Sequence, residues 1–265
     1  MRWVTELGAA TERSVTYVGG LTQLFGRSAR LLFASPLKRK RMLQRAIHQA
    51  MAAGVGAIPI TSLITFFIGV IIALQGAYEL QKLGAMQMVA SLVAISITRE
   101  LGPLVTAIVV IGRSGSAFAA EIGTMRVTEE LDALETMALD PVAFLVLPKF
   151  LAMAVMMPCL TIWADLMGIL GGSLFGVVGG GLTFGSYLTA TRDALLSHDV
   201  VSGFIKSIVF GLVITAVGCH EGFSTGAGAE QVGRSTTSAV VISILLVIVI
   251  DLVFTTLFYI AQGGA

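Results

Sequence analysis

Several apolar runs in this sequence are each long enough to cross a membrane, and their length constrains the fold more than any other feature. They occupy residues 50–77, 88–112, 142–170, 200–219 and 239–260. A helix needs about 20 apolar residues to span the hydrocarbon core of a bilayer. The chain is 55% hydrophobic and only 12% charged, against about 25% charged in soluble domains. We therefore predict an all-α polytopic membrane protein with five transmembrane helices.

The third apolar run leaves a second topology open. It extends over 41 residues, from Val142 to Leu182, with Asp165 near its middle. A tight turn at Asp165 would divide the run and give six spans. Gly172, Gly176 and Gly180 repeat every four residues, a spacing that permits close helix packing in membranes.

The basic residues are concentrated before the first span. Nine of the 17 lie between Arg2 and Arg45, including the run at 38–41. Because cytoplasmic flanks of membrane spans carry an excess of Lys and Arg, we expect a cytoplasmic N-terminus. Residues 1–265 are treated as one domain, in which residues 1–45 form a cytoplasmic or interfacial segment and residues 46–265 the transmembrane domain.

Part of the N-terminal segment has the pattern of an amphipathic helix. Between residues 15 and 35, apolar side chains recur at near-helical spacing, and Arg27 and Arg30 fall on the other side. A helix of this kind lies in the membrane interface with its cations near the lipid phosphates. A soluble helix is the alternative interpretation.

Two adjacent opposite charges, Arg99 and Glu100, lie in the middle of the second run. One charged residue at a helix centre costs about 2.5–3.5 kcal/mol on insertion scales. Neighbouring residues point to different sides of a helix, so the two charges cannot neutralise each other. Pro103 also removes the helical hydrogen bond to the Arg99 carbonyl. We interpret the segment as lining a cavity, or as pairing with Asp165, Lys206 or Asp251 on another span.

The stretch from Arg113 to Asp140 is polar, with six acids and two arginines. Thr128 is expected to cap a short helix whose first turn holds Glu129 and Glu130. This pattern favours a cytoplasmic docking helix between the second and third spans, although a solvated loop is an alternative.

These features belong to a series of motifs between residues 99 and 251, within a longer stretch, about residues 15–260, over which the sequence is similar to one known family. The motifs are Arg99-Glu-Leu-Gly-Pro103, the stretches 112–126, 128–134 and 137–141, Ile205-Lys-Ser-Ile-Val-Phe-Gly211, Gly233-Arg-Ser-Thr-Thr237, and Asp251 in the last span. In these motifs the sequence resembles the MlaE family of ABC-transporter permeases, the membrane subunits of bacterial and plastid phospholipid transporters.

The resemblance implies an N-terminal interfacial helix, five spans and a coupling helix between the second and third spans. It implies a multi-pass protein of the bacterial inner membrane that pairs with a second permease copy, expected to be identical. The expected partners are an ABC ATPase subunit, which binds ATP and Mg²⁺, a hexameric MCE-domain lipid-binding protein, phospholipid and, in some complexes, a STAS-domain protein. No nucleic-acid partner is expected, and no cofactor in this chain. The implied function is movement of phospholipid between the inner membrane and the periplasmic MCE protein, which contributes to outer-membrane lipid homeostasis.

Two sets of candidate site residues follow. The lipid cavity is expected to involve Leu74, Tyr78, Arg99, Glu100 and Leu101; ordinary helix packing is the alternative for the apolar members. The ATPase coupling surface is expected to comprise Glu121, Gly123, Met125, Arg126, Glu129, Glu130, Leu131, Asp132, Leu134 and Met137.

Other function classes remain open at this point. An ion-coupled secondary transporter could use Arg99, Glu100, Asp165 and Asp251 as a relay. An intramembrane lipid-modifying enzyme would need a convergent catalytic or metal-binding set, and the three histidines are scattered without metal-ligand spacing. The sequence contains no Gly-x-x-x-x-Gly-Lys-[Ser/Thr] phosphate loop. We therefore predict a non-catalytic transmembrane subunit with no metal site.

Overall fold

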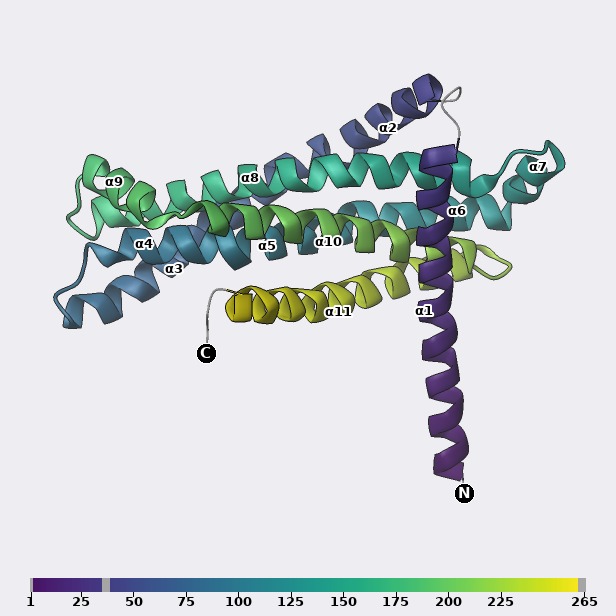
Figure 1. The fold of residues 1–265 in the computed structure, drawn as a ribbon, viewed down its shortest axis with the longest axis horizontal. Helices are drawn as coiled ribbons and strands as arrows, with labels where there is room; N and C mark the ends of the chain where they lie inside the picture. The colour runs from purple at the N-terminus through teal and green to yellow at the C-terminus, as the bar shows by residue number, and fades with distance from the viewer. Residues whose placement is uncertain (1, 35–38, 262–265) are drawn as a thin grey trace.

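A computed structural model describes residues 2–34 and 39–261, and nearly all of these residues are helical (Figure 1). Residues 1, 35–38 and 262–265, including Lys38 of the basic run, lie outside the described part. In chain order the main helices are α1 (Arg2–Ala34), α2 (Arg39–Ala53), α3 (Ile58–Lys82), α4 (Met88–Ser96), α5 (Gly102–Val110), α6 (Ser116–Val127), α7 (Glu130–Thr136), α8 (Leu147–Val178), α9 (Phe184–Ala194), α10 (Ser197–Phe223) and α11 (Ala229–Ala261). No strand occurs within the described ranges.

Five helical segments are long and apolar enough to cross a membrane. They run over Met42–Lys82, Met88–Val127, Val142–Val178, Ser197–Phe223 and Ala229–Ala261. The five-span prediction is confirmed, although each helix extends beyond its apolar run. The third segment is the most buried inside the protein and the fifth is the least. The third span is therefore the centre of the bundle, and the fifth lies at its edge.

The six-span alternative is wrong, because α8 passes through Asp165 without a break. The Asp165 carboxylate lies against Gly102 of α5, and a Cβ atom added at Gly102 would overlap with that carboxylate. The missing side chain at Gly102 makes room for a carboxyl group on the face of a continuous helix, so no turn is needed to accommodate it.

The first span contains a local kink near its start. Helix α2 ends at Ala53, and a 3₁₀ turn (η2) covers Val55–Ala57. Pro59 lies in the first turn of α3, where proline is favoured. The far end of α3 is longer than expected. Residues 78–82, which follow the predicted span 50–77, form its last helical turn, where Lys82 and Glu79 make an exposed ion pair at 3.2 Å.

Three five-residue π-helical segments interrupt the second and third spans. They are η3 (Ile97–Leu101), η4 (Ile111–Gly115) and η5 (Val142–Val146). The first of them carries Arg99 and Glu100 and immediately precedes the turn that contains Pro103. π-Segments of this kind are frequent at functional sites in helices. The predicted backbone disturbance beside the charged pair is thereby confirmed.

Helix α9 packs across the glycine-rich part of α8. A Cβ added at Gly172 would lie 2.7 Å from the Tyr187 hydroxyl oxygen, and one added at Gly176 would lie 2.9 Å from the Tyr187 ring. The close packing predicted for these glycines is confirmed. Burial raises the pKa of Tyr187 to about 12, because the ionised phenolate would lose its hydration. Helix α9 is short and ends at Ala194.

The two ends of the bundle differ in structure. At one end α1 crosses the spans at a steep angle (Figure 1), where it contacts α10, the segment Val142–Val146 and α8. At the other end lie α9 and the connection between α3 and α4 (Figure 1). The polar connection that contains α7 and the amphipathic N-terminal helix are therefore on the same side of the bundle.

Candidate functional site

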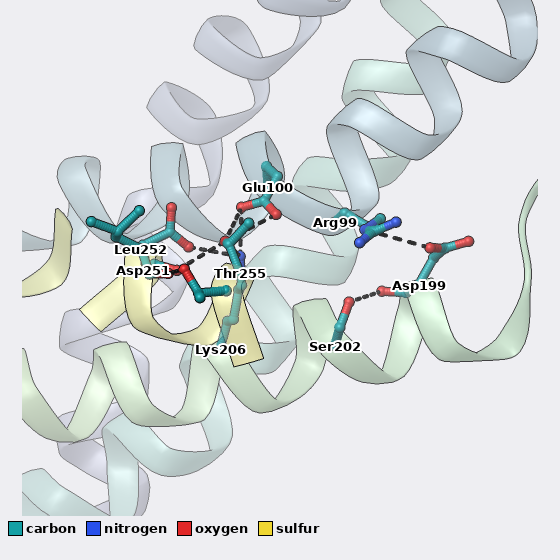
Figure 2. Close-up of polar contacts among 9 residues, drawn as sticks. Arg99, Glu100, Asp199, Ser202, Lys206, Asp251, Leu252 and Thr255 are labelled. Carbon is teal, nitrogen blue, oxygen red and sulfur yellow. Dashed lines mark hydrogen bonds and ion pairs between the residues drawn. The ribbon is translucent and has the colours of Figure 1, made fainter. Parts of the chain in front are cut away.

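The most polar feature inside the bundle is a cluster of charged side chains around Lys206. The Lys206 ammonium lies 2.5 Å from a Glu100 carboxylate oxygen and 2.8 Å from one of Asp251. It also donates a hydrogen bond of 2.8 Å to the Thr255 hydroxyl. Figure 2 shows these side chains converging from η3, α10 and α11. Because Lys206 is only 1% exposed, its charge is stabilised by these groups and not by water.

Arg99 points away from this cluster, as expected for neighbouring helical residues. Its guanidinium Nε lies 3.7 Å from the Asp199 carboxylate near the start of α10 (Figure 2). The same Asp199 oxygen lies 3.2 Å from His198 Nε2, and the other oxygen accepts a 3.1 Å hydrogen bond from the Leu196 backbone amide. The two adjacent charges therefore join separate groups on the same partner helix.

The structure decides which of the suggested partners meet. Lys206 contacts Glu100 directly, and Asp251 joins the cluster through Lys206. Asp165 is not part of it, since its carboxylate lies at Gly102. Thr255 and Asp199 were missed by the sequence reasoning. The position of Thr255 one helical turn after Asp251 was an available signal, whereas only the tertiary structure reveals Asp199.

The residues proposed for the lipid cavity are only partly brought together. Leu74 and Tyr78 line a cavity of about 410 Å³ at the α9 end of the bundle, with Phe175 on the facing helix. Leu101 packs instead against an apolar cluster that includes Ile97. Arg99 and Glu100 are not among the residues that line this cavity. The Tyr78 side chain remains largely exposed.

The polar connection between the second and third spans contains the short helix α7, but its first turn differs from the prediction. Glu129 adopts a left-handed conformation, with φ of 62°, and α7 begins at Glu130. Thr128 does not cap α7. It ends α6, and its hydroxyl lies 3.0 Å from the Thr124 carbonyl. The chain reverses direction at Glu129, which places the Thr128 side chain on the preceding helix.

The ten residues proposed for ATPase coupling separate into a buried and an exposed group. The buried or half-buried members are Gly123, Met125, Leu131 and Leu134. The exposed members are Glu121, Arg126, Glu129, Glu130, Asp132 and Met137. An ion pair of 3.2 Å joins Arg126 to Asp132. The exposed members of α7 and its flanks form a charged surface at the end of the bundle, which we call the α7 surface.

Glu121 differs from the other exposed members because it has an internal partner. One of its carboxylate oxygens lies 2.6 Å from the ammonium of Lys149, a residue of α8 that is fully buried. The same ammonium lies 4.9 Å from the centre of the Phe118 ring. Lys149 was not assigned a role from the sequence, and nothing in its apolar surroundings indicated its partner.

Five apolar helices, with an ion cluster buried among them and a charged connection at one end, define an α-helical multi-pass membrane protein. Within the described ranges, no group of three or more His, Cys, Asp or Glu side chains is arranged to hold a metal ion.

Comparison with known proteins identifies the family. The family model described as Permease MlaE matches residues 46–257. A probable ABC transporter permease protein of Rickettsia prowazekii is 40% identical over 86% of this chain and 88% of its own length. The intermembrane phospholipid transport system permease protein MlaE of Haemophilus influenzae is 35% identical over 88% of this chain and 91% of its own length. The chain belongs to the MlaE family of ABC transporter permeases.

Proposed function

We propose that this chain is the transmembrane subunit of a transporter that moves phospholipid between the bacterial inner membrane and a periplasmic MCE-domain protein, and so contributes to outer-membrane lipid homeostasis. The main support is its similarity, over nearly the full length of both chains, to a permease named for intermembrane phospholipid transport. In this proposal the chain is not an enzyme. ATP and Mg²⁺ bind to a separate ATPase subunit.

The ATPase is proposed to dock on the α7 surface. This surface lies on a connection between two spans, and its exposed side chains are mostly charged. Glu129 and Glu130 have no basic partner among the ion pairs of the described residues, which leaves both carboxylates free to meet cations of another protein. The excess of basic residues in the N-terminal segment supports a cytoplasmic position for this end of the bundle.

Copurification tests the docking proposal. Glu129→Lys together with Glu130→Lys should reduce recovery of the ATPase, while the permease still inserts and purifies. Thr136→Lys is the control, because it changes charge on the exposed end of α7 outside the proposed set. Equal ATPase recovery with all these variants would contradict docking at the α7 surface.

The opposite end of the bundle is proposed to receive the lipid. Leu74 and Tyr78 line an open, mostly apolar cavity there, and such a wall suits acyl chains. The MCE-domain hexamer would engage this end, with a second, identical permease copy beside the first. A STAS-domain protein bound to the ATPase is a further expected component.

Photo-crosslinking in cells tests the lipid site. A crosslinker at Leu74 or Tyr78 should capture phospholipid more strongly when ATP is available. A crosslinker at Phe67, an exposed residue of the same helix that does not line the cavity, reports contact with the surrounding bilayer. Equal, ATP-independent capture at all three positions would remove the cavity assignment.

An ion-coupled transporter is the second candidate, because the cluster around Lys206 places three charged side chains inside the bundle. The contacts of Lys206 favour a structural role, since its ammonium group donates hydrogen bonds to Glu100 and Thr255 and forms an ion pair with Asp251. Transport that survives ATP depletion but stops with an uncoupler would favour this second candidate.

A further inference from the structure

The helix α1 is fixed to the end of the bundle by a polar contact at the start of the third span. The Arg27 guanidinium donates a 3.1 Å hydrogen bond to the Asp140 Oδ1 atom. The same oxygen accepts a 3.0 Å hydrogen bond from the backbone amide of Val142. Asp140 therefore caps the beginning of the third span and holds α1 at the same atom. It is also the residue through which the chain passes from the α7 connection into that span.

Apolar packing joins α1 to α7 independently of this ion pair. Leu131 and Leu134, the two buried residues of α7, belong to a core cluster with residues of η5, α8 and α10. Three leucines of α1 pack against that cluster: Leu21, Leu24 and Leu31. The buried face of α7 and the apolar face of α1 thus share one core.

Aromatic contacts fix α1 further along the same face. The Phe25 and Phe150 rings meet edge to face, with centroids 5.8 Å apart. The Tyr17 and His220 rings do the same at 4.8 Å. His220 also lies so close to Gly20 that a Cβ there would come within 2.6 Å of the ring. Contacts at both ends of this stretch of α1 fix its angle across the bundle (Figure 1).

A groove separates the two helices on the surface. It has a volume of about 340 Å³, and its walls include Gln23 and Leu24 of α1 together with Leu131 and Glu135 of α7. The contact between α1 and α7 is therefore made at the shared core and at Asp140, while the exposed edges of the two helices remain apart.

We propose that α1 is a positioning element for α7, with Leu24, Arg27 and Asp140 as its positioning residues. The inference deepens the proposed function, because α7 is the proposed docking site of the ATPase. Since α1 and α7 share one core, they move together, and a displacement of α7 by the ATPase is passed to a helix that lies across the bundle. The exposed Arg27–Asp140 pair contributes little stability by itself. In this proposal the buried leucines supply the stability of the contact, and the ion pair selects the position of α1.

Distance measurement between spin labels tests the inference without any ATPase. Labels at Gln23 and Glu135, on opposite sides of the groove, would be placed in a chain with Cys159→Ser and Cys219→Ala. We expect one narrow distance distribution in this parent chain. Leu24→Ala together with Arg27→Gln should broaden or shift it. Arg30→Gln is the matched control, an exposed arginine one turn along α1 with no acid partner among the described ion pairs.

Asp140→Asn separates the two roles of the carboxylate. Its amide oxygen can still accept the hydrogen bond of the Val142 amide, but the charge that attracts Arg27 is lost. Asp140→Asn and Arg27→Gln should therefore change the distribution alike, and the double variant no more than either one. Arg27→Lys should restore the parent distribution. A distribution that is unchanged in every one of these variants would overturn the positioning role, whether or not the ATPase docks on α7.

The assembled transporter provides a second measurement. With Leu24→Ala and Arg27→Gln, we expect the complex to retain its ATPase subunit but to move about fivefold less lipid for each ATP hydrolysed, within the range by which single sites change coupling. A parental ratio in this variant would also contradict the inference. Failure of the parent chain to recover any ATPase would instead contradict the proposed function, and the distance measurement would still decide the role of α1.

Discussion

Gly69 of α3 lies directly against the backbone carbonyl of Gly168 of α8, at a separation that leaves no room for a Cβ atom at Gly69. A Cβ at Gly69 would overlap with the Gly168 oxygen, and a Cβ at Gly171, nearly one turn further along α8, would overlap with the Phe66 carbonyl. Two backbones thus touch at successive turns. In a bilayer, where apolar side chains gain little by leaving lipid, such close approach is a main source of helix association.

Gly69→Ala should therefore destabilise the protein. The added methyl group must push α3 away from α8, at a cost of about 1–3 kcal/mol typical of overpacking. Gly112→Ala is the control, because a Cβ at Gly112 meets nothing within 4 Å. Thermal unfolding in detergent, followed by circular dichroism, should show a lower midpoint for the first variant only. Equal midpoints would mean that the two helices separate without cost.

Lys206→Met should destabilise the protein strongly, by about 3–5 kcal/mol, because it leaves Glu100 and Asp251 close together without their shared cation. Adding Glu100→Gln and Asp251→Asn to that variant removes the unpaired charges and should recover most of the loss. Lys82→Met is the control, since the Lys82–Glu79 pair is largely exposed and contributes little. Yield and unfolding midpoint after purification measure the effect. No recovery in the triple variant would show that charge balance is not the cause.

Glu121→Gln should destabilise the protein because it removes the only ion-pair partner of the fully buried Lys149 among the described residues. We expect a loss of about 3 kcal/mol, because the Lys149 ammonium stays buried without a counter-charge. Combining it with Lys149→Met should recover much of this loss. Glu129→Gln, at an exposed position, should leave the unfolding midpoint unchanged.

The same variants distinguish docking from folding at Glu121. If Glu121 acts only by holding Lys149, ATPase recovery should return in the variant with both Glu121→Gln and Lys149→Met. Continued loss of the ATPase from a well-folded double variant would instead support direct contact between Glu121 and the ATPase.

The termini should lie on opposite sides of the membrane, because the chain has five candidate spans. A fluorescent protein that matures only in the cytoplasm should be bright when fused within the α7 connection after Leu139 and dark when fused after Ala265. Fluorescence at both positions would contradict the orientation of five spans with a cytoplasmic N-terminus.

Local sequence was sufficient to place the apolar spans, except at Asp165, where the continuous helix α8 excluded a sixth span. In hydrocarbon, the backbone amides and carbonyls of a segment must hydrogen-bond to each other. A long apolar run therefore forms a helix whatever its neighbours are. The kink before Pro59 and the π-helical segment beside Pro103 were likewise predictable, since the missing amide of proline acts on its own helix. The ends of helices could be predicted less accurately, as residues 78–82 and Thr128 show. Helix ends depend on individual side-chain contacts and, here, on the left-handed backbone at Glu129.

The sequence by itself determined that this chain is a polytopic α-helical membrane protein with isolated charges inside its helices, and its motifs indicated the family. The continuity of α8 through Asp165, which gives five spans and not six, was visible only in the structure. Only the tertiary structure decided how those charges are paired: Glu100 with Lys206 and Asp251, Arg99 with Asp199, and Glu121 with Lys149. The physical reason is the range of each effect. Transfer of a helix into the bilayer depends on the composition of that one segment. An ion pair depends on the rotation and register of two helices that are distant in the chain, as Glu100 and Lys206 are, 106 residues apart.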